Sequence, residues 1–169
     1  RRMFYQLIQN KRDLWFQSPD CTVRDLVDYI YQRGMMRDAQ IDAIKTYLYL
    51  KIACQGQPLW KLFAEGKFNI TDVDAEEINV EARDTMMQNP AALALYQYSR
   101  QKDRNGTQIA PELEQFIRQH AREIDYEQVL KDIFYGVTYS DYLFSLPMGA
   151  GKTYLMAAFI YIDLYFAQK

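Results

Sequence analysis

Hydrophobic residues recur at helical spacing along nearly the whole chain, and this pattern limits the fold more than any other feature. The clearest stretches are residues 22–34, 37–54, 111–124 and 126–134. Apolar side chains three and four residues apart lie on one face of an α-helix. Pro90 and Pro111 stand where helices can begin, and Gly34 stands where one can end. The sequence therefore predicts a mainly α-helical bundle of roughly seven or eight helices.

Composition and charge narrow the class of protein further. The chain has 169 residues, of which 49% are hydrophobic and 25% charged, as expected for a globular domain. Twenty Lys and Arg residues oppose 22 Asp and Glu residues, so no overall positive field attracts nucleic acid. Cys21 and Cys54 lack metal-ligand spacing, and no signal peptide opens the chain. We expect a cytoplasmic protein without a disulfide framework.

The C-terminal region changes character twice. Residues 139–146 are short, aromatic and apolar, which makes them the best strand candidate in the chain. Residues 154–167 form the longest apolar stretch, interrupted only by Asp163. At about 14 residues this stretch is shorter than the roughly 20 needed to span a bilayer. It predicts a buried core helix and no membrane partner.

Between that strand and that helix lies a glycine-rich loop. It reads Pro147-Met148-Gly149-Ala150-Gly151-Lys152-Thr153. In a strand–loop–helix unit, glycines let the backbone N–H groups of the loop turn inward and surround a phosphate at the start of the helix. The sequence predicts that the amides of Gly149, Ala150 and Gly151 contact phosphate, that Lys152 reaches the β- and γ-phosphates, and that the Thr153 hydroxyl ligates Mg²⁺.

This loop resembles motif I of superfamily 2 helicases and translocases. It is most similar to the type III restriction enzymes and their DEAD/DEAH-box relatives, whose motif reads Thr-Gly-x-Gly-Lys-Thr, followed by Tyr and aliphatic residues. Tyr154, Leu155 and Met156 follow here. The chain departs from the patterns at two positions: Met148 stands where the family has Thr, and Leu146 where the general phosphate loop has its first glycine.

A second stretch resembles the same family. Those enzymes carry Arg-x-x-Gln-x-x-Ala-Ile near the start of the ATPase core, where the Gln recognises adenine, and residues 37–44 read Arg-Asp-Ala-Gln-Ile-Asp-Ala-Ile. The resemblance makes Gln40 the adenine-contacting residue. It also implies three regions: residues 1–55 with the adenine motif, a helical insertion over 56–135, and residues 136–169 as the first strand, loop and helix of a RecA-like α/β domain.

The resemblance implies the N-terminal, ATP-binding part of an ATP-dependent DNA helicase or translocase of the restriction type. ATP and Mg²⁺ are the implied ligands, and DNA and a methyltransferase or other subunit are the implied partners. In that family two RecA-like domains open and close to ratchet along DNA. Hydrolysis needs a later acidic motif and arginines from the second domain, which this sequence lacks, so we expect this chain alone not to hydrolyse ATP.

Two other functions stay open from the sequence. Another phosphate-loop ATPase or a kinase would use the same glycine loop. A non-enzymatic helical interaction module would use the segment 56–135 for docking, with the loop incidental. Arg100, Lys102 and Arg104, close to Tyr96 and Tyr98, form a small basic and aromatic patch of the kind that holds single strands, although a solvated loop is the commoner outcome.

Overall fold

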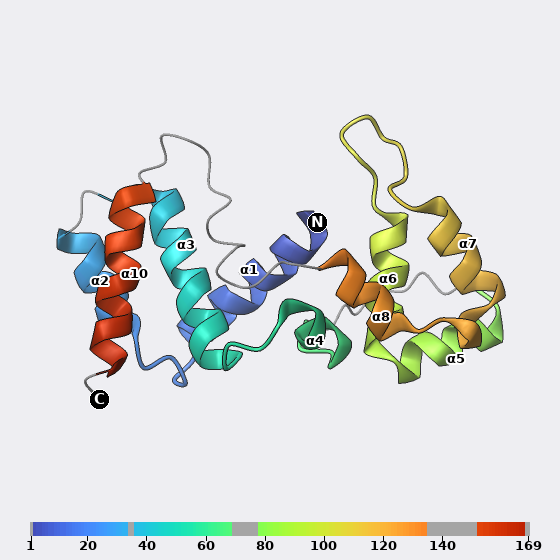
Figure 1. Ribbon diagram of the computed structural model, residues 1–169, viewed down its shortest axis with the longest axis horizontal. Helices are drawn as coiled ribbons and strands as arrows, with labels where there is room; N and C mark the ends of the chain where they lie inside the picture. The colour runs from blue at the N-terminus through green and yellow to red at the C-terminus, as the bar shows by residue number, and fades with distance from the viewer. Residues whose placement is uncertain (1, 34–35, 69–77, 135–151, 168–169) are drawn as a thin grey trace. The chain divides into compact units, whose positions relative to one another are not determined.

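The computed structural model describes residues 2–33, 36–68, 78–134 and 152–167, and these residues are mainly helical (Figure 1). The elements are α1 (Arg2–Gln17), α2 (Arg24–Arg33), α3 (Asp38–Leu48), the π-helix η1 (Tyr49–Ala53), α4 (Leu59–Ala64), α5 (Val80–Gln88), α6 (Pro90–Arg100), α7 (Pro111–Gln119), the 3₁₀ turn η3 (Ala121–Glu123), α8 (Tyr126–Ile133) and α10 (Lys152–Ala167). Within the described ranges there is no β-strand, only an isolated antiparallel bridge between Lys102 and Gln108. The predicted strand at 139–146 lies outside them.

The chain divides into two compact units. Unit 1 consists of Arg1–Tyr5 and Pro58–Gly136, and unit 2 consists of Gln6–Gln57 and Val137–Lys169. The family resemblance predicts a different division: an adenine motif in residues 1–55, an insertion over 56–135, and the phosphate loop in 136–169. The two units are defined by contacts within the chain, which do not test these functional roles, so the roles stay predictions.

Unit 1 is built around α6, which packs against α4, α5, α7 and α8. Leu62, Leu95, Ile117 and Leu130 are almost completely buried in it. Phe63 adds an aromatic cluster, since its ring centroid lies 4.6 Å from that of Phe4 and 5.5 Å from that of Phe134. One apolar face of each short helix is thereby buried, as the helical spacing of the sequence predicts.

Local side-chain caps set the helix starts of unit 1. The Asn79 side chain accepts a hydrogen bond from the Ala82 N–H at 2.7 Å at the start of α5. Asn89 accepts from the Ala91 N–H at 3.0 Å, directly before Pro90. Each cap satisfies a backbone N–H that has no partner inside its helix. The predicted helix starts at Pro90 and Pro111 are confirmed.

Two helix boundaries in unit 1 differ from the prediction. The apolar spacing predicts one helix through residue 124, but α7 ends at Gln119, because the backbone of His120 leaves the helical region (φ −135°, ψ 41°). The acidic residues from Asp72 onward also favour a helix, which the sequence predicts to extend through Met87. Residues 69–77 lie outside the described part, and α5 starts only at Val80, since Asn79 acts as its N-cap.

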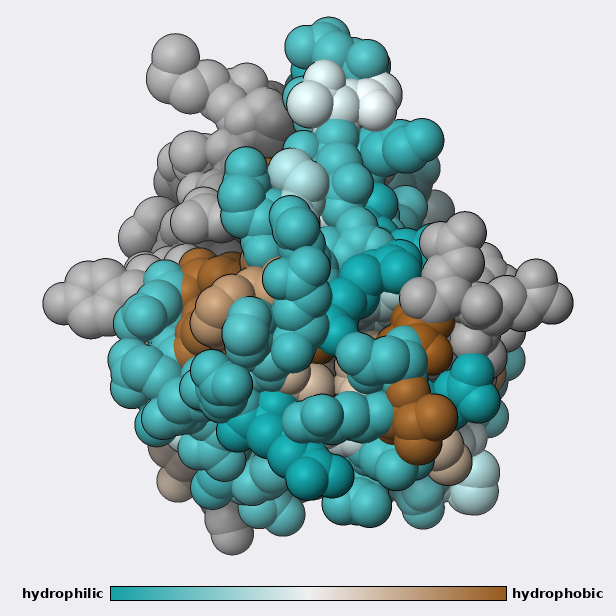
Figure 2. Space-filling view, turned by 90° about the vertical axis from the view of Figure 1, so that its right-hand side faces the viewer, coloured by the Kyte–Doolittle hydropathy of each residue, from teal (hydrophilic) through white to brown (hydrophobic). Residues whose placement is uncertain are grey.

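The surface over α5 and α7 is largely polar. Figure 2 looks at this side of the molecule and shows a mostly hydrophilic surface with separate hydrophobic areas. Val80, Met87 and Phe116 are among the exposed apolar side chains of these helices. His120 lies at the edge of this surface, where its ring centroid is 4.9 Å from that of Phe116 and its Nδ1 is 3.3 Å from a Glu123 oxygen. With 42% of its side chain exposed, His120 lies at the boundary between core and solvent.

Unit 2 contains α2, α3, α10 and most of α1. Its core joins residues from all three later helices, among them Val27, Ile44, Leu48 and Ile162. The continuous helix predicted for residues 37–54 is confirmed in extent, but its last turn is the π-helix η1. Gln55 and Gly56 follow with φ of 54° and 64°, a left-handed conformation that ends the helix.

Helix α10 is apolar on all sides, and among its described side chains some are buried and others are exposed. Ala158, Phe159 and Ile162 are buried, whereas Ile160, Tyr161 and Leu164 are about half exposed or more. The prediction of a buried core helix is therefore wrong for one face, because the neighbouring helices of unit 2 cover only the other. Among the described helices, none combines the length and hydropathy that crossing a bilayer requires.

Candidate nucleotide-binding site

The candidate site is built on α3 and α10, which lie side by side in unit 2 (Figure 1). The ring centroids of Tyr47 and Phe159 are 4.6 Å apart. One turn further along, Lys51 forms an ion pair with Asp163. Because residue numbers rise together from one contact to the next, the two helices run parallel and begin at the same end.

This parallel packing fixes the register between the two predicted motifs. The two contacts have the same sequence offset, although Lys51 stands in the π-helix η1 that continues α3. Continued toward the N-termini, the register makes Gln40 level with Lys152. Gln40 also lies two helical turns before Tyr47, on the same face of α3. Two motifs far apart in the sequence therefore begin adjacent helices at one end of unit 2.

Gln40 is buried in the first turn of α3, with 3% of its surface exposed. Its Oε1 accepts a hydrogen bond from the Arg37 N–H at 2.7 Å, which caps the helix. The same side chain that was expected to contact adenine thus also fixes the start of α3.

The glycine loop itself lies mostly outside the described residues. This holds for Gly149, Ala150 and Gly151, and of Lys152 and Thr153 only the backbone is described. That backbone forms the first turn of α10. The first N–H groups of a helix have no intrahelical partner and carry partial positive charge. The N-terminus of α10 therefore coincides with the end of the predicted glycine loop.

A polar cluster joins the middle of α10 to the end of α3. The Tyr47 hydroxyl donates a hydrogen bond to Asp163 Oδ1 at 2.7 Å, and Lys51 Nζ donates to the same oxygen and to the Tyr47 hydroxyl. The sequence analysis noted Asp163 only as an interruption of an apolar stretch. A single acidic residue in an apolar helix signals a partner elsewhere, although the spacing does not reveal which.

The cluster shifts the ionisation of its three members. Burial and then the hydrogen bond to Asp163 raise the pKa of Tyr47. Burial alone would lower the pKa of Lys51, but its bonds to Asp163 and Tyr47 outweigh this and raise it. Burial alone would raise the pKa of Asp163, but hydrogen bonds from Lys51 and Tyr47 lower it. Lys51 and Asp163 are thus a charged pair at neutral pH, and Tyr47 stays protonated.

Two other kinds of site were considered within the described ranges: a metal site and the predicted basic patch. No group of three or more His, Cys, Asp or Glu side chains there is arranged to hold a metal ion. In the predicted basic patch, Arg100 lies 3.8 Å from a Glu114 carboxylate oxygen, while Lys102 and Arg104 are exposed around the turn that Gly106 completes.

Comparison with known proteins gives no further guide. The chain matches no protein-family model, no curated protein and no solved structure.

Proposed function

We propose that unit 2 binds ATP, as the ATP-binding part of a cytoplasmic, ATP-dependent DNA helicase or translocase of the restriction-enzyme type. The observation that supports this most is the shared level of Gln40 and Lys152 at the start of two parallel helices. An adenine-recognising residue and a phosphate-binding lysine must both reach one nucleotide. The contacts between α3 and α10 bring their backbones to the same end despite the long intervening segment.

In this proposal each motif residue has a separate task. The amides from Gly149 to Lys152 surround the phosphates, assisted by the positive end of α10. The Lys152 ammonium neutralises the β- and γ-phosphates as a point charge. The Gln40 carboxamide, which is 3% exposed and bonded to the Arg37 N–H, would contact adenine once the start of α3 exposes it. Because α3 and α10 are joined below by Lys51 and Asp163, the two contact points stay in register.

Mg²⁺ fits this site only in part. When bound, it would neutralise phosphate charge and polarise the transferring group. Thr153, at the second position of α10, would supply one hydroxyl ligand, and the first turn of α10 itself contains no acidic residue. Mg²⁺ usually takes one or two carboxylates in addition to substrate phosphates. We therefore propose nucleotide binding without turnover by this chain, with DNA and a methyltransferase or other subunit as partners of the larger enzyme.

The test is a titration of the chain with a fluorescent ATP analogue in the presence of Mg²⁺. Lys152→Ala should weaken binding at least about tenfold, since a phosphate loses its charge partner. Gln40→Ala should weaken binding of the ATP analogue more than binding of inorganic triphosphate, because only the former has adenine.

The matched control is Lys102→Ala, which removes the same charge from an exposed position of unit 1. It should leave binding unchanged. Equal binding by wild type and Lys152→Ala contradicts the proposal. A loss with Lys102→Ala instead would move the anion site to the basic patch of unit 1 and favour an interaction module.

A further inference from the structure

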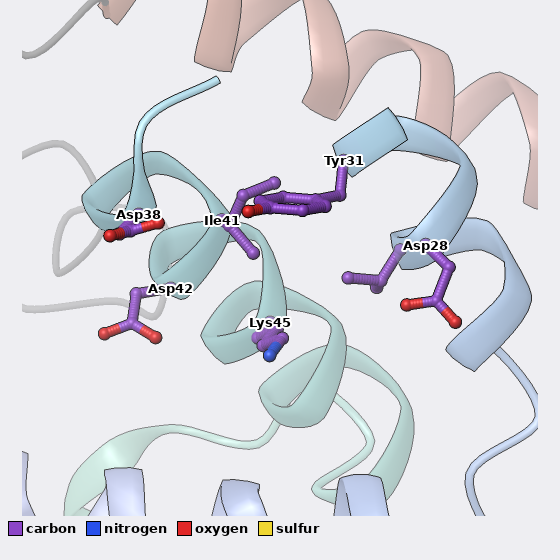
Figure 3. Close-up of a pocket in the computed structure, with 7 residues that line it drawn as sticks. Asp28, Tyr31, Asp38, Ile41, Asp42 and Lys45 are labelled. Atoms are coloured by element: carbon purple, nitrogen blue, oxygen red, sulfur yellow. The ribbon is translucent and has the colours of Figure 1, made fainter. Parts of the chain in front are cut away.

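A second feature of unit 2 is a pocket between α2 and α3, which shares Asp38, Ile41 and Asp42 with the segment 37–44 but does not rest on nucleotide binding. Its volume is about 370 Å³, within the range of small-molecule sites. Val27 and Ile41 supply its apolar lining. Figure 3 shows Tyr31 and Ile41 in its centre, between Asp28 from α2 and Asp38 from α3. An alkyl chain would find an apolar and aromatic surface here, with charged groups at both sides.

The charged side chains around the pocket differ in whether they already have a partner. Asp42 is already engaged, since its carboxylate lies 3.2 Å from Arg12 Nη2. Within the described part of the chain, Asp28 and Asp38 form neither an ion pair nor a side-chain hydrogen bond, and both are exposed. The remaining charge belongs to Lys45, whose Nζ lies 5.7 Å from the centroid of the Phe16 ring.

A ligand that matches these groups needs two positive charges and one negative charge on an aliphatic chain. Two carboxylates favour two cationic groups, while the Lys45 ammonium favours an anionic group beside them. A linear polyamine satisfies the carboxylates but brings a third positive charge toward Lys45. A basic amino acid has an α-ammonium, a cationic side chain and an α-carboxylate, joined by methylenes that can lie on Ile41 and Tyr31.

We propose that this pocket binds a free basic amino acid such as L-arginine. The α-carboxylate pairs with Lys45, and the two cationic groups pair with Asp28 and Asp38. The Tyr31 ring covers the side chain of the ligand.

The ligand pair that tests this is L-arginine and agmatine, which is the same molecule without the carboxylate. Attraction to acidic residues alone would make the doubly positive agmatine bind more tightly. The proposal gives the reverse order, because only arginine satisfies Lys45. Calorimetric titration of the chain should show arginine binding about fivefold more tightly than agmatine, as expected for one partly exposed ion pair.

Variants assign each contact. Asp28→Asn and Asp38→Asn should each weaken arginine binding about fivefold. Lys45→Met keeps the methylenes over Phe16 and should remove the preference for arginine over agmatine. The control Asp84→Asn removes the same charge from an exposed position in unit 1 and should change nothing.

Three results would overturn the proposal. The first is agmatine binding to the wild-type chain as tightly as arginine or more tightly, and the second is pocket variants that bind arginine as well as the control Asp84→Asn does. Binding of a peptide that ends in arginine, without binding of the free amino acid, would instead assign the pocket to a partner protein.

Discussion

Unit 1 begins its helices with side chains that act within a few residues, whereas unit 2 joins its helices through polar side chains far apart in the sequence. In unit 1, Asn79, Asn89 and Asp125 each cap the helix that follows directly. In unit 2, Arg12 bonds to residues of α3, and Asp163 of α10 bonds to Tyr47 and Lys51. Local caps begin helices in both units, since Gln40 also caps α3, and a long-range bond from Asn79 to the Arg118 carbonyl occurs in unit 1 as well. What distinguishes unit 2 is that a nearly buried charged side chain, Arg12, takes part in its long-range bonds.

The largest expected effects on stability come from cavities made in the core of each unit. Leu95 in unit 1 and Ile44 in unit 2 are completely buried. Leu95→Ala and Ile44→Ala should each destabilise their own unit by about 3 kcal/mol, because each leaves a cavity in a packed core. Hydrogen exchange measured peptide by peptide should show lost protection in the substituted unit only. Equal loss in both units for either variant would mean that they unfold together.

Arg12 should give the next largest effect. Its side chain is 4% exposed, and Nη1 donates to the Asp42 carbonyl at 3.1 Å and to Thr46 Oγ1 at 2.9 Å. Arg12→Met should destabilise unit 2 by about 2 kcal/mol, since the buried Thr46 hydroxyl oxygen loses its donor, whereas the Asp42 carbonyl keeps the Thr46 hydroxyl and Asp13 and Asp42 stay solvated. Chemical denaturation measures the loss. Arg104→Met, at an exposed position of unit 1, is the control, and an equal effect of both would refute a role for this network.

These networks mark the limit of what the sequence predicts. Helix identity follows from apolar spacing, and the prolines at 90 and 111 locate two helix starts correctly. The end of α7 was missed because Ile124 continues the apolar spacing, although His120 has left the helix. The pairing of Lys51 with Asp163 was missed because no local pattern connects them. For the candidate site, the sequence supplied the residues of both motifs but not the parallel register of α3 and α10.

The Lys51–Asp163 pair should have a smaller and pH-dependent effect. The Asp163 side chain is 54% exposed, so Asp163→Asn should cost only about 0.5 to 1 kcal/mol at pH 7. Because the pKa of Asp163 is lowered in the folded protein, the pair stabilises the fold above the ordinary carboxyl pKa of 3.8 and loses this effect as the pH falls below it. Denaturation at pH 7 and below pH 3.8 should show the difference between variant and wild type shrinking in acid. A constant difference would exclude the ion pair as its cause.

The smallest effect is expected on the exposed face of α10. Leu164 is 57% exposed, whereas Phe159 on the opposite face is 8% exposed and packs on Tyr47. Leu164→Ser should change the free energy of unfolding by less than about 0.5 kcal/mol, as exposed substitutions do, while Phe159→Ala should cost about 3 kcal/mol. Denaturation of the two variants side by side measures the asymmetry. The sequence of α10 is equally apolar on both faces, so only its packing within unit 2 can produce such a difference. Similar losses of stability from both substitutions would show that the second face is also covered.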